Sequence, residues 1–152
     1  MSIDVEVQFA VDADGLPKPE EFVRWIEAAL DGKREEAEVA VRIVAADESR
    51  WLNASYRGKD RPTNVLSFPV GLPDDVEVPL LGDVILCAQV AREEAAARGK
   101  PLTAHLAHLT VHGVLHLLGY DHLENGQAET MEALEVAILR RLGYPDPYDT
   151  DY

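Results

Sequence analysis

The chain is poor in three features that proteins use to build cross-links, enter membranes or bind polyanions: cysteine, long apolar runs and basic residues. Its single cysteine, Cys87, cannot form an internal disulfide. No apolar run approaches the length that spans a bilayer. The opening segment, Met1 to Glu6, carries acids where a secretion signal carries basic residues. These features predict a cytoplasmic protein of a reducing compartment with no membrane partner.

Basic residues number only 14 against 28 acidic ones, which gives a net charge of -14. Since basic surface drives phosphate binding, this balance argues against a nucleic-acid partner unless the cations are concentrated in one place. One such place exists, because Arg57, Lys59 and Arg61 fall within five residues. Arginine can hold a phosphate through two parallel hydrogen bonds. Taken alone, however, the cluster is explained more simply as a solvated loop.

The length of 152 residues and a hydrophobic fraction of 47% suit a single packed domain. We expect it to span residues 1–152, with a short flexible tail at 144–152. Hydrophobic periodicity predicts strands at residues 3–9, 38–45, 65–70 and 82–88, and helices at 20–30, from an N-cap at Asp47 to about Tyr56, and at 89–98, 102–118 and 127–142. This order predicts an α+β fold in which a small mixed β-sheet packs against helices.

The strongest chemical signal is a group of three histidines, His112, His116 and His122. The first two are four residues apart, so a helix places both imidazoles on one face, one turn apart. Gly119 can end that helix in the left-handed conformation and allow the chain to bring His122 to the same metal. Three imidazoles leave a fourth position open for water, the pattern of a catalytic zinc. The sequence therefore predicts a site for one Zn²⁺ on the long helix and the turn after it.

Zinc proteases use the same ligand spacing, with a glutamate after the first histidine as the general base. This chain has Gly113 there, and glycine cannot take a proton from water. A glutamate introduced at 113 is expected to restore the position of the base. His105 lies too far along the helix to share the metal, whereas His108 is one turn from His112 and can support the site from outside. An ordinary structural role for both histidines stays equally open.

Two stretches are similar to a known family. The segment 112–122, His-Gly-Val-Leu-His-Leu-Leu-Gly-Tyr-Asp-His, and the segment 56–69, Tyr-Arg-Gly-Lys-Asp-Arg-Pro-Thr-Asn-Val-Leu-Ser-Phe-Pro, resemble the bacterial YbeY endoribonucleases, also called ribosomal RNA maturation factors. Gly82-Asp83, at the start of the last predicted strand, also looks like the family's pattern. The resemblance covers most of the chain.

The resemblance implies a cytoplasmic, zinc-dependent, single-strand-specific endoribonuclease that acts on the 3′ end of small-subunit ribosomal RNA and in ribosome quality control. His112, His116 and His122 would be the zinc ligands, and Arg57 the functional arginine beside the metal. Asp121 is a candidate to orient His122 or a water, although a turn residue is equally plausible there. The acidic body suits docking on basic ribosomal proteins or other assembly factors.

Two other functions remain open at this stage. One is a metalloprotease-like hydrolase, which the ligand spacing favours and Gly113 opposes. The other is a non-catalytic ribosome assembly factor in which zinc only stabilises the fold. A fourth protein ligand would favour that structural role, whereas an open position would favour catalysis.

Overall fold

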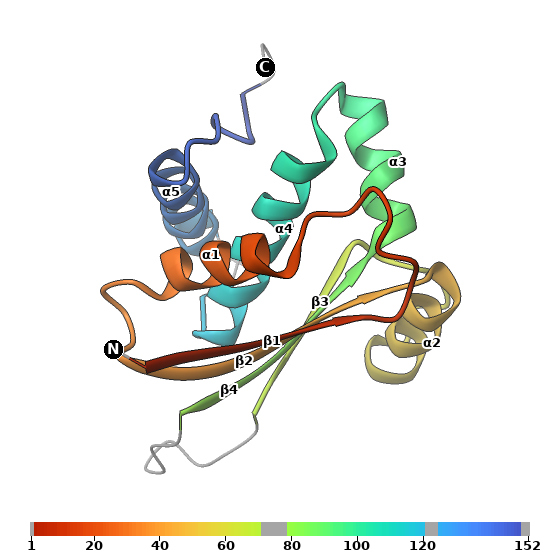
Figure 1. Cartoon of the computed structure of the whole chain (residues 1–152), viewed down its shortest axis with the longest axis horizontal. Coiled ribbons are helices and arrows are strands. Elements are labelled where there is room, and N and C mark those ends of the chain that lie inside the picture. The colour runs from red at the N-terminus through yellow and green to blue at the C-terminus, as the bar shows by residue number, and fades with distance from the viewer. Residues whose placement is uncertain (1, 71–78, 121–124, 150–152) are drawn as a thin grey trace.

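The computed structural model describes residues 2–70, 79–120 and 125–149. In this part of the chain it shows the predicted α+β domain, a four-stranded sheet with five helices (Figure 1). The elements are β1 (Ser2–Phe9), α1 (Pro19–Leu30), β2 (Glu36–Val44), α2 (Ala46–Arg57), β3 (Val65–Pro69), β4 (Leu80–Cys87), α3 (Ala88–Arg98), α4 (Leu102–Leu117) and α5 (Asn125–Arg141).

The predicted start of the second helix is wrong by a short distance. The N-cap of α2 is Ala45, and Asp47 lies inside the first turn, where its carboxylate accepts a hydrogen bond from the backbone N–H of Glu48 at 2.9 Å. An acid in the first turn still interacts favourably with the partial positive charge of the helix N-terminus. Asp47 therefore supports the helix electrostatically without being its cap.

The sheet is mixed, as predicted, with strand order β1-β2-β4-β3. β1, β2 and β4 run parallel, and β3 pairs antiparallel with β4 at the edge of the sheet. Pro69 is tolerated in β3 because an edge strand has one side without a partner. Gly82 pairs with Pro69 at φ +143°, and a Cβ at position 82 would overlap the Phe68 carbonyl oxygen. Glycine therefore permits the close approach of β3 to β4.

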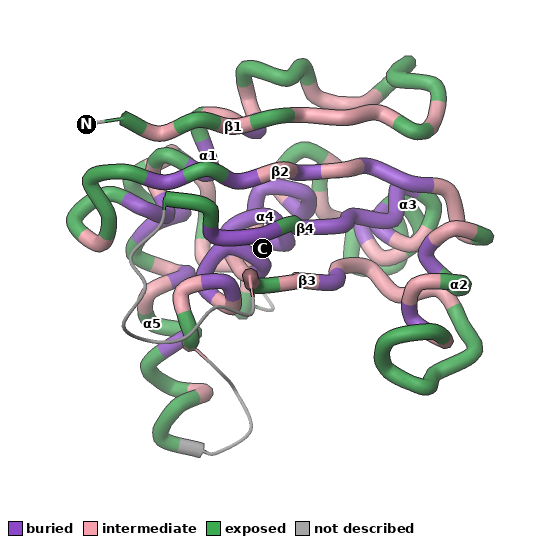
Figure 2. The backbone as a smooth tube through the Cα atoms, turned by 90° about the horizontal axis from the view of Figure 1, so that it is seen from below, coloured by how far each residue is buried: buried purple, intermediate pink, exposed green. Residues whose placement is uncertain are grey.

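Helices cover both faces of the sheet. α1 and α4 lie over one face, with α5 packed on α4, and α2 lies over the other face beside β3 and β4 (Figure 1). The larger core forms between the sheet and the first group, where α1 contributes the buried Phe22, Trp25 and Ile26. A smaller cluster under α2 contains Leu66 and Ile85. Burial is most extensive along β4, where only Leu80 and Asp83 are exposed; it alternates along β2 and is weakest along β1 (Figure 2).

α4 approaches the sheet closely at Gly113. Its carbonyl oxygen accepts a hydrogen bond from the Ser67 hydroxyl of β3 at 2.9 Å. A Cβ on Gly113 would lie 2.7 Å from Val84 Cγ1 and 3.3 Å from Val65 Cγ2. A side chain at position 113 thus points into the sheet, so the expectation that a glutamate there restores a protease base is wrong.

Gly113→Glu is expected to lower the free energy of unfolding by about 3 kcal/mol or more, because it overpacks a tight contact and buries an unpaired carboxyl group. Urea denaturation of the parent and the variant measures this difference. Equal stability of the two proteins, or chelator-sensitive peptidase activity in the variant, would contradict the packing described for α4.

The segment Tyr144–Asp149, inside the predicted flexible tail, contacts the body of the domain. The indole Nε1 of Trp25 donates to the Tyr144 hydroxyl at 3.2 Å. The Tyr148 hydroxyl donates to the Glu135 carboxylate of α5 at 2.7 Å. These contacts hold the segment against α1 and α5.

None of the helices in the described part of the chain has the length and apolar character needed to cross a bilayer.

Candidate active site

Two of the three predicted zinc ligands meet on one face of α4. The Nε2 atoms of His112 and His116 lie 3.1 Å apart, and their ring centroids are 4.7 Å apart. The side chain of His112 is 22% exposed, so solvent and a ligand can reach it. The sequence predicts these imidazoles one helical turn apart, and the structure brings their Nε2 atoms together.

This spacing fits a shared metal ion. Two nitrogens bound to one tetrahedral zinc at about 2.0–2.1 Å stand about 3.3 Å apart. The observed 3.1 Å between the two Nε2 atoms is close to that value. The third predicted ligand, His122, and the neighbouring Asp121 lie outside the described residues. Within the described ranges no group of three histidine, cysteine or acidic side chains is arranged to hold a metal, so a complete site is not seen there.

A buried carboxylate from α5 lies behind the histidines. Glu135 is only 1% exposed, and its Oε2 atom is 3.2 Å from Nδ1 of His112. Its Oε1 atom is 2.5 Å from Nε2 of His108. Burial alone would raise the pKa of Glu135, but the hydrogen bonds from His108 and His112 lower it to about 2. Glu135 is thus a carboxylate that accepts hydrogen bonds from both imidazoles.

Tyr148 completes the surroundings of Glu135. Burial first, and the neighbouring Glu135 carboxylate second, raise the pKa of the Tyr148 hydroxyl far above its ordinary value. The hydroxyl therefore keeps its proton and donates to Glu135 Oε1. The question left open for His108 is answered in part, because His108 contacts Glu135 and Tyr148 beside the site.

His105 has a structural partner away from the predicted ligands. It is 2% exposed, and its Nε2 is 2.9 Å from the Glu94 carboxylate of α3. Burial lowers the pKa of His105 from its ordinary 6.5, and the hydrogen bond to Glu94 raises it by less. The folded protein therefore holds this proton more weakly than the unfolded chain does.

This difference predicts a pH dependence. Because the folded-state pKa of His105 is depressed, protonation favours unfolding, and stability falls as the pH drops through 6.5. His105→Gln keeps a donor for Glu94 but cannot titrate, so it should lose less stability than the parent on acidification. Urea denaturation at about pH 7.5 and 5.5 measures both proteins. Parallel losses would contradict a depressed pKa at this position.

The basic cluster lies where α2 passes into β3. Arg57 is the last residue of α2, and Gly58 follows in the left-handed conformation at φ +70°. Arg57, Lys59 and Arg61 are all exposed, and none of their side chains forms an ion pair or hydrogen bond with another residue in the described ranges. An acidic protein thus presents three cations together on one short segment, which is the arrangement phosphate binding requires.

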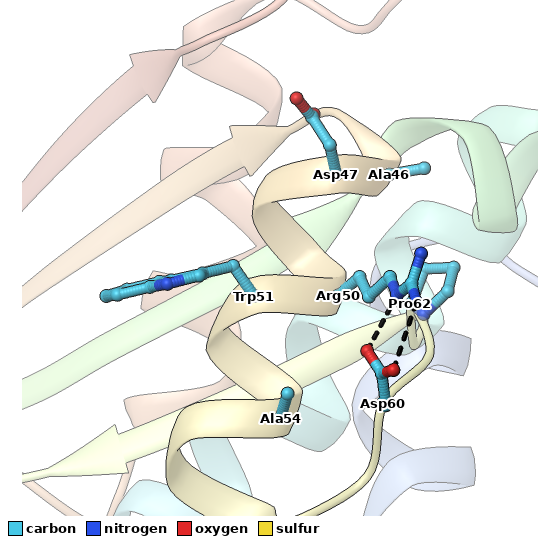
Figure 3. Close-up of a pocket in the computed structure, with 7 residues that line it drawn as sticks. All are labelled: Ala46, Asp47, Arg50, Trp51, Ala54, Asp60 and Pro62. Atoms are coloured by element: carbon cyan, nitrogen blue, oxygen red, sulfur yellow. Dashed lines mark hydrogen bonds and ion pairs between the residues drawn. The ribbon is translucent and has the colours of Figure 1, made fainter.

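Three α2 side chains hold this segment in place. Arg50 makes a two-point ion pair with Asp60, at 2.7 and 3.0 Å (Figure 3). The Asn53 amide donates to the Arg61 carbonyl oxygen at 2.8 Å, and the Ser49 hydroxyl both accepts from and donates to the backbone of Thr63. The hydrogen bonds from Arg50 also hold the pKa of the Asp60 carboxyl group below its ordinary value, and the Arg50 guanidinium balances the negative charge of Asp60. The backbone of the basic segment is therefore held in place, and Asp60 is paired with Arg50 rather than with Arg57, Lys59 or Arg61.

The close-up in Figure 3 also shows the outer surface of α2. A shallow groove of about 580 Å³ lies there, and Trp51 projects from α2 on the side away from the Arg50–Asp60 pair. Trp51 is 63% exposed. The groove contains no histidine, so it is separate from the imidazole pair of α4.

The chain neighbours of Arg57 and His112 contact the same edge strand, β3, from opposite faces of the sheet. Tyr56, next to Arg57, places its ring 5.2 Å from the ring of Phe68. Gly113, next to His112, accepts a hydrogen bond from Ser67. Ser67 and Phe68 are adjacent in β3. The segments that carry the two candidate groups thus meet β3 at adjacent residues.

The family model described as endoribonuclease YbeY matches residues 10–143. The chain belongs to the YbeY endoribonuclease family. The fold is also similar to the solution structure of TM1509 from Thermotoga maritima, with a TM-score of 0.60 and 25% sequence identity. That match covers 95% of this chain and 99% of the other.

Membership of the YbeY family confirms the resemblance drawn from the two motifs. It implies a nuclease, a hydrolase of phosphodiester bonds, that has RNA as its substrate in ribosomal RNA processing. The matched range contains every residue predicted for the site, from Arg57 to His122.

Sequence reasoning missed Glu135 and the anchors Ser49 and Asn53. One signal was available for all three. Each is a polar residue on the side of its helix that faces the core, and buried polar groups are kept where they have hydrogen-bond partners. Glu135 stands four residues after Met131 and three before Ile138, a spacing at which an apolar side chain is expected.

Proposed function

We propose that this chain is a zinc-dependent endoribonuclease specific for single-stranded RNA, acting on the 3′ end of small-subunit ribosomal RNA and in ribosome quality control. His112, His116 and His122 are the proposed ligands of one Zn²⁺ per chain. The observation that carries the proposal is the convergence of the His112 and His116 Nε2 atoms at 3.1 Å. Membership of the YbeY family supplies the RNA substrate.

The residues of the chain have separate tasks in this proposal. A bound zinc would lower the pKa of a water towards about 7 and polarise a phosphoryl oxygen. Arg57 holds the phosphate and stabilises the negative charge that develops on it. Asp121 is proposed to orient His122 or a water. Ser49, Arg50 and Asn53 hold the backbone that follows Arg57, so less ordering is needed when RNA binds.

The edge position of β3 suits a single strand. The exposed Tyr56, which precedes Arg57 in the chain, places its ring against Phe68 of β3, while α4 contacts the adjacent Ser67. A flexible single strand of RNA can pass over the edge strand β3. It can then bring one phosphate between Arg57 on one face of the sheet and the histidines on the other. A stiff duplex bends much less easily. The two segments on β3 therefore support the proposed specificity for single-stranded RNA.

Binding of basic protein partners and binding of RNA require different surfaces of this acidic protein. The net charge of -14 favours basic protein partners, which we propose to be ribosomal proteins or other assembly factors in the cytoplasm. We assign the three cations Arg57, Lys59 and Arg61 to RNA binding. The alternatives are a metalloprotease-like hydrolase and a non-catalytic assembly factor stabilised by zinc. Gly113 opposes the first because its Cβ position faces Val84 and cannot present a base.

One cleavage assay separates these functions. The purified, zinc-loaded chain is incubated with end-labelled RNA that extends past the mature 3′ end of small-subunit ribosomal RNA, as a single strand and annealed to its complement, and with an unstructured protein. We expect cuts in the single strand alone. Cleavage of the protein without cleavage of RNA would favour the protease, and a zinc-loaded chain that cuts neither would favour the assembly factor.

A further inference from the structure

We propose that Glu135 is a positioning residue for the metal site, which keeps His112 in the tautomer that leaves Nε2 able to bind metal. This inference rests on the proposed function, because it assigns a role at the same site. It adds a residue from α5 to a site that sequence motifs place wholly on α4 and the turn after it.

The carboxylate divides its two oxygens between two groups of donors. Oε2 is directed at Nδ1 of His112, at 3.2 Å. Oε1 lies near Nε2 of His108, at 2.5 Å, and accepts from the Tyr148 hydroxyl at 2.7 Å. Because His108 and Tyr148 occupy one oxygen, the orientation of the carboxylate is fixed and the other oxygen is left for His112.

This contact decides where His112 carries its proton. An ionised carboxylate only accepts hydrogen bonds, so the hydrogen between the two groups is on Nδ1. In a neutral imidazole the remaining nitrogen, Nε2, then keeps its lone pair. That nitrogen is the one that faces Nε2 of His116. A carboxylate on the far ring nitrogen is the usual means by which proteins fix a metal-binding imidazole and increase its basicity.

Core packing alone does not explain a glutamate at this position. Glu135 is 1% exposed and lies on the face of α5 that buries Met131 and Ile138. Replacing a buried charged group by an apolar one of similar volume is often neutral for stability or favourable. A helix selected only for packing would carry an apolar residue there, whereas a helix that must orient His112 requires an acceptor.

Glu135→Gln tests the role with little change of volume. The amide oxygen can accept from only one side of the group, and His108 together with Tyr148 offers two donors there. The amide NH₂ then faces His112 Nδ1, which must become an acceptor and move its proton to Nε2. We expect the metal-free variant to hold His112 as the Nε2–H tautomer, and to bind zinc about 10–100-fold more weakly than the parent.

Two measurements report these effects without an activity assay. Long-range ¹H–¹⁵N correlation spectra of the metal-free proteins distinguish a protonated from an unprotonated ring nitrogen of His112. Competition with a chromophoric chelator gives the zinc dissociation constant. Glu94→Gln is the matched control, because it changes the carboxylate partner of a different α4 histidine, His105. It should leave the His112 tautomer and the zinc affinity unchanged.

Glu135→Met is the second variant. It introduces an apolar side chain of similar length and removes both acceptor oxygens, so it remains informative if the amide variant folds poorly. Glu135→Asp retains the charge at a shorter reach and should recover part of the zinc affinity. A structural role alone predicts that Met, which packs well, behaves as the parent does.

The outcomes separate this inference from the proposed function. If the parent binds zinc tightly and the Gln and Met variants keep both the parent tautomer and the parent affinity, Glu135 does not position His112, and the nuclease proposal stands. If the parent itself shows no specific zinc binding, both proposals are overturned. A weaker affinity in the Gln and Met variants, partly recovered by Asp, supports the inference.

Discussion

His116→Ala is expected to remove zinc from the protein and abolish RNA cleavage. His116 supplies one of the two Nε2 atoms that stand 3.1 Å apart, so its loss leaves half of the observed pair. Loss of a group that only supports a ligand costs about 10–100-fold in metal affinity, and loss of a ligand should exceed about 100-fold. Metal analysis and chelator competition measure the zinc, and single-turnover cleavage of single-stranded RNA measures the activity.

The fold should tolerate this change. His116 is partly exposed near the end of α4, and alanine is the most favourable helix residue. His105→Gln at about pH 7.5 is a suitable control, because it replaces another histidine of the same helix that has its own partner on α3. Full zinc occupancy and parent-level cleavage in His116→Ala would show that the predicted ligand set is wrong.

The second large effect is expected from Arg57→Ala, with RNA cleavage reduced about 10²–10³-fold, equivalent to roughly 2.7–4 kcal/mol of transition-state stabilisation. Arg57 is exposed, and its side chain forms no ion pair or hydrogen bond within the described part of the chain. Zinc content and melting temperature should therefore change little. Arg57→Lys should recover only part of the rate, since an ammonium group cannot make the paired contact to phosphate.

Arg98→Ala is a matched control for Arg57→Ala. Arg98 is the last residue of α3 and is followed by Gly99 at φ +65°, just as Arg57 is followed by Gly58 at φ +70°. Both substitutions remove the same favourable interaction with a helix C-terminus. Only Arg57 belongs to the basic segment beside β3. Equal cleavage rates in the two variants would exclude a specific role for Arg57, and Lys59 and Arg61 would become the next candidates.

Local patterns predicted the elements of this fold well, because each depends on residues close in the sequence. The alternation in 3–9 and the apolar run in 82–88 both gave strands, and the glycines at 58 and 99 mark where α2 and α3 end. The order of the strands in the sheet was not predictable in this way. The insertion of β4 between β2 and β3 depends on which faces pack together, and a single sequence carries no local signal for it.

The candidate site also contains residues that local spacing predicts and residues that depend on how the helices pack. His112 and His116 were predictable because four residues of helix fix their relative position. Glu135 was not, since its contact with His112 depends on how α5 packs against α4. The anchoring of the basic segment by Asn53 also depends on how the chain folds back along α2. The roles of His122 and Asp121 stay predictions, because these residues lie outside the described ranges.

The most direct test of the central claim is a zinc titration of the metal-free chain, with RNA cleavage and bound zinc measured on the same samples. Zinc is removed with a chelator, which is then removed by gel filtration, and Zn²⁺ is returned in steps. The account predicts that cleavage of single-stranded RNA is absent at the start, rises in proportion to bound zinc and stops rising at one zinc per chain. Parent-level cleavage by the metal-free chain, or no cleavage at full zinc occupancy, would contradict it.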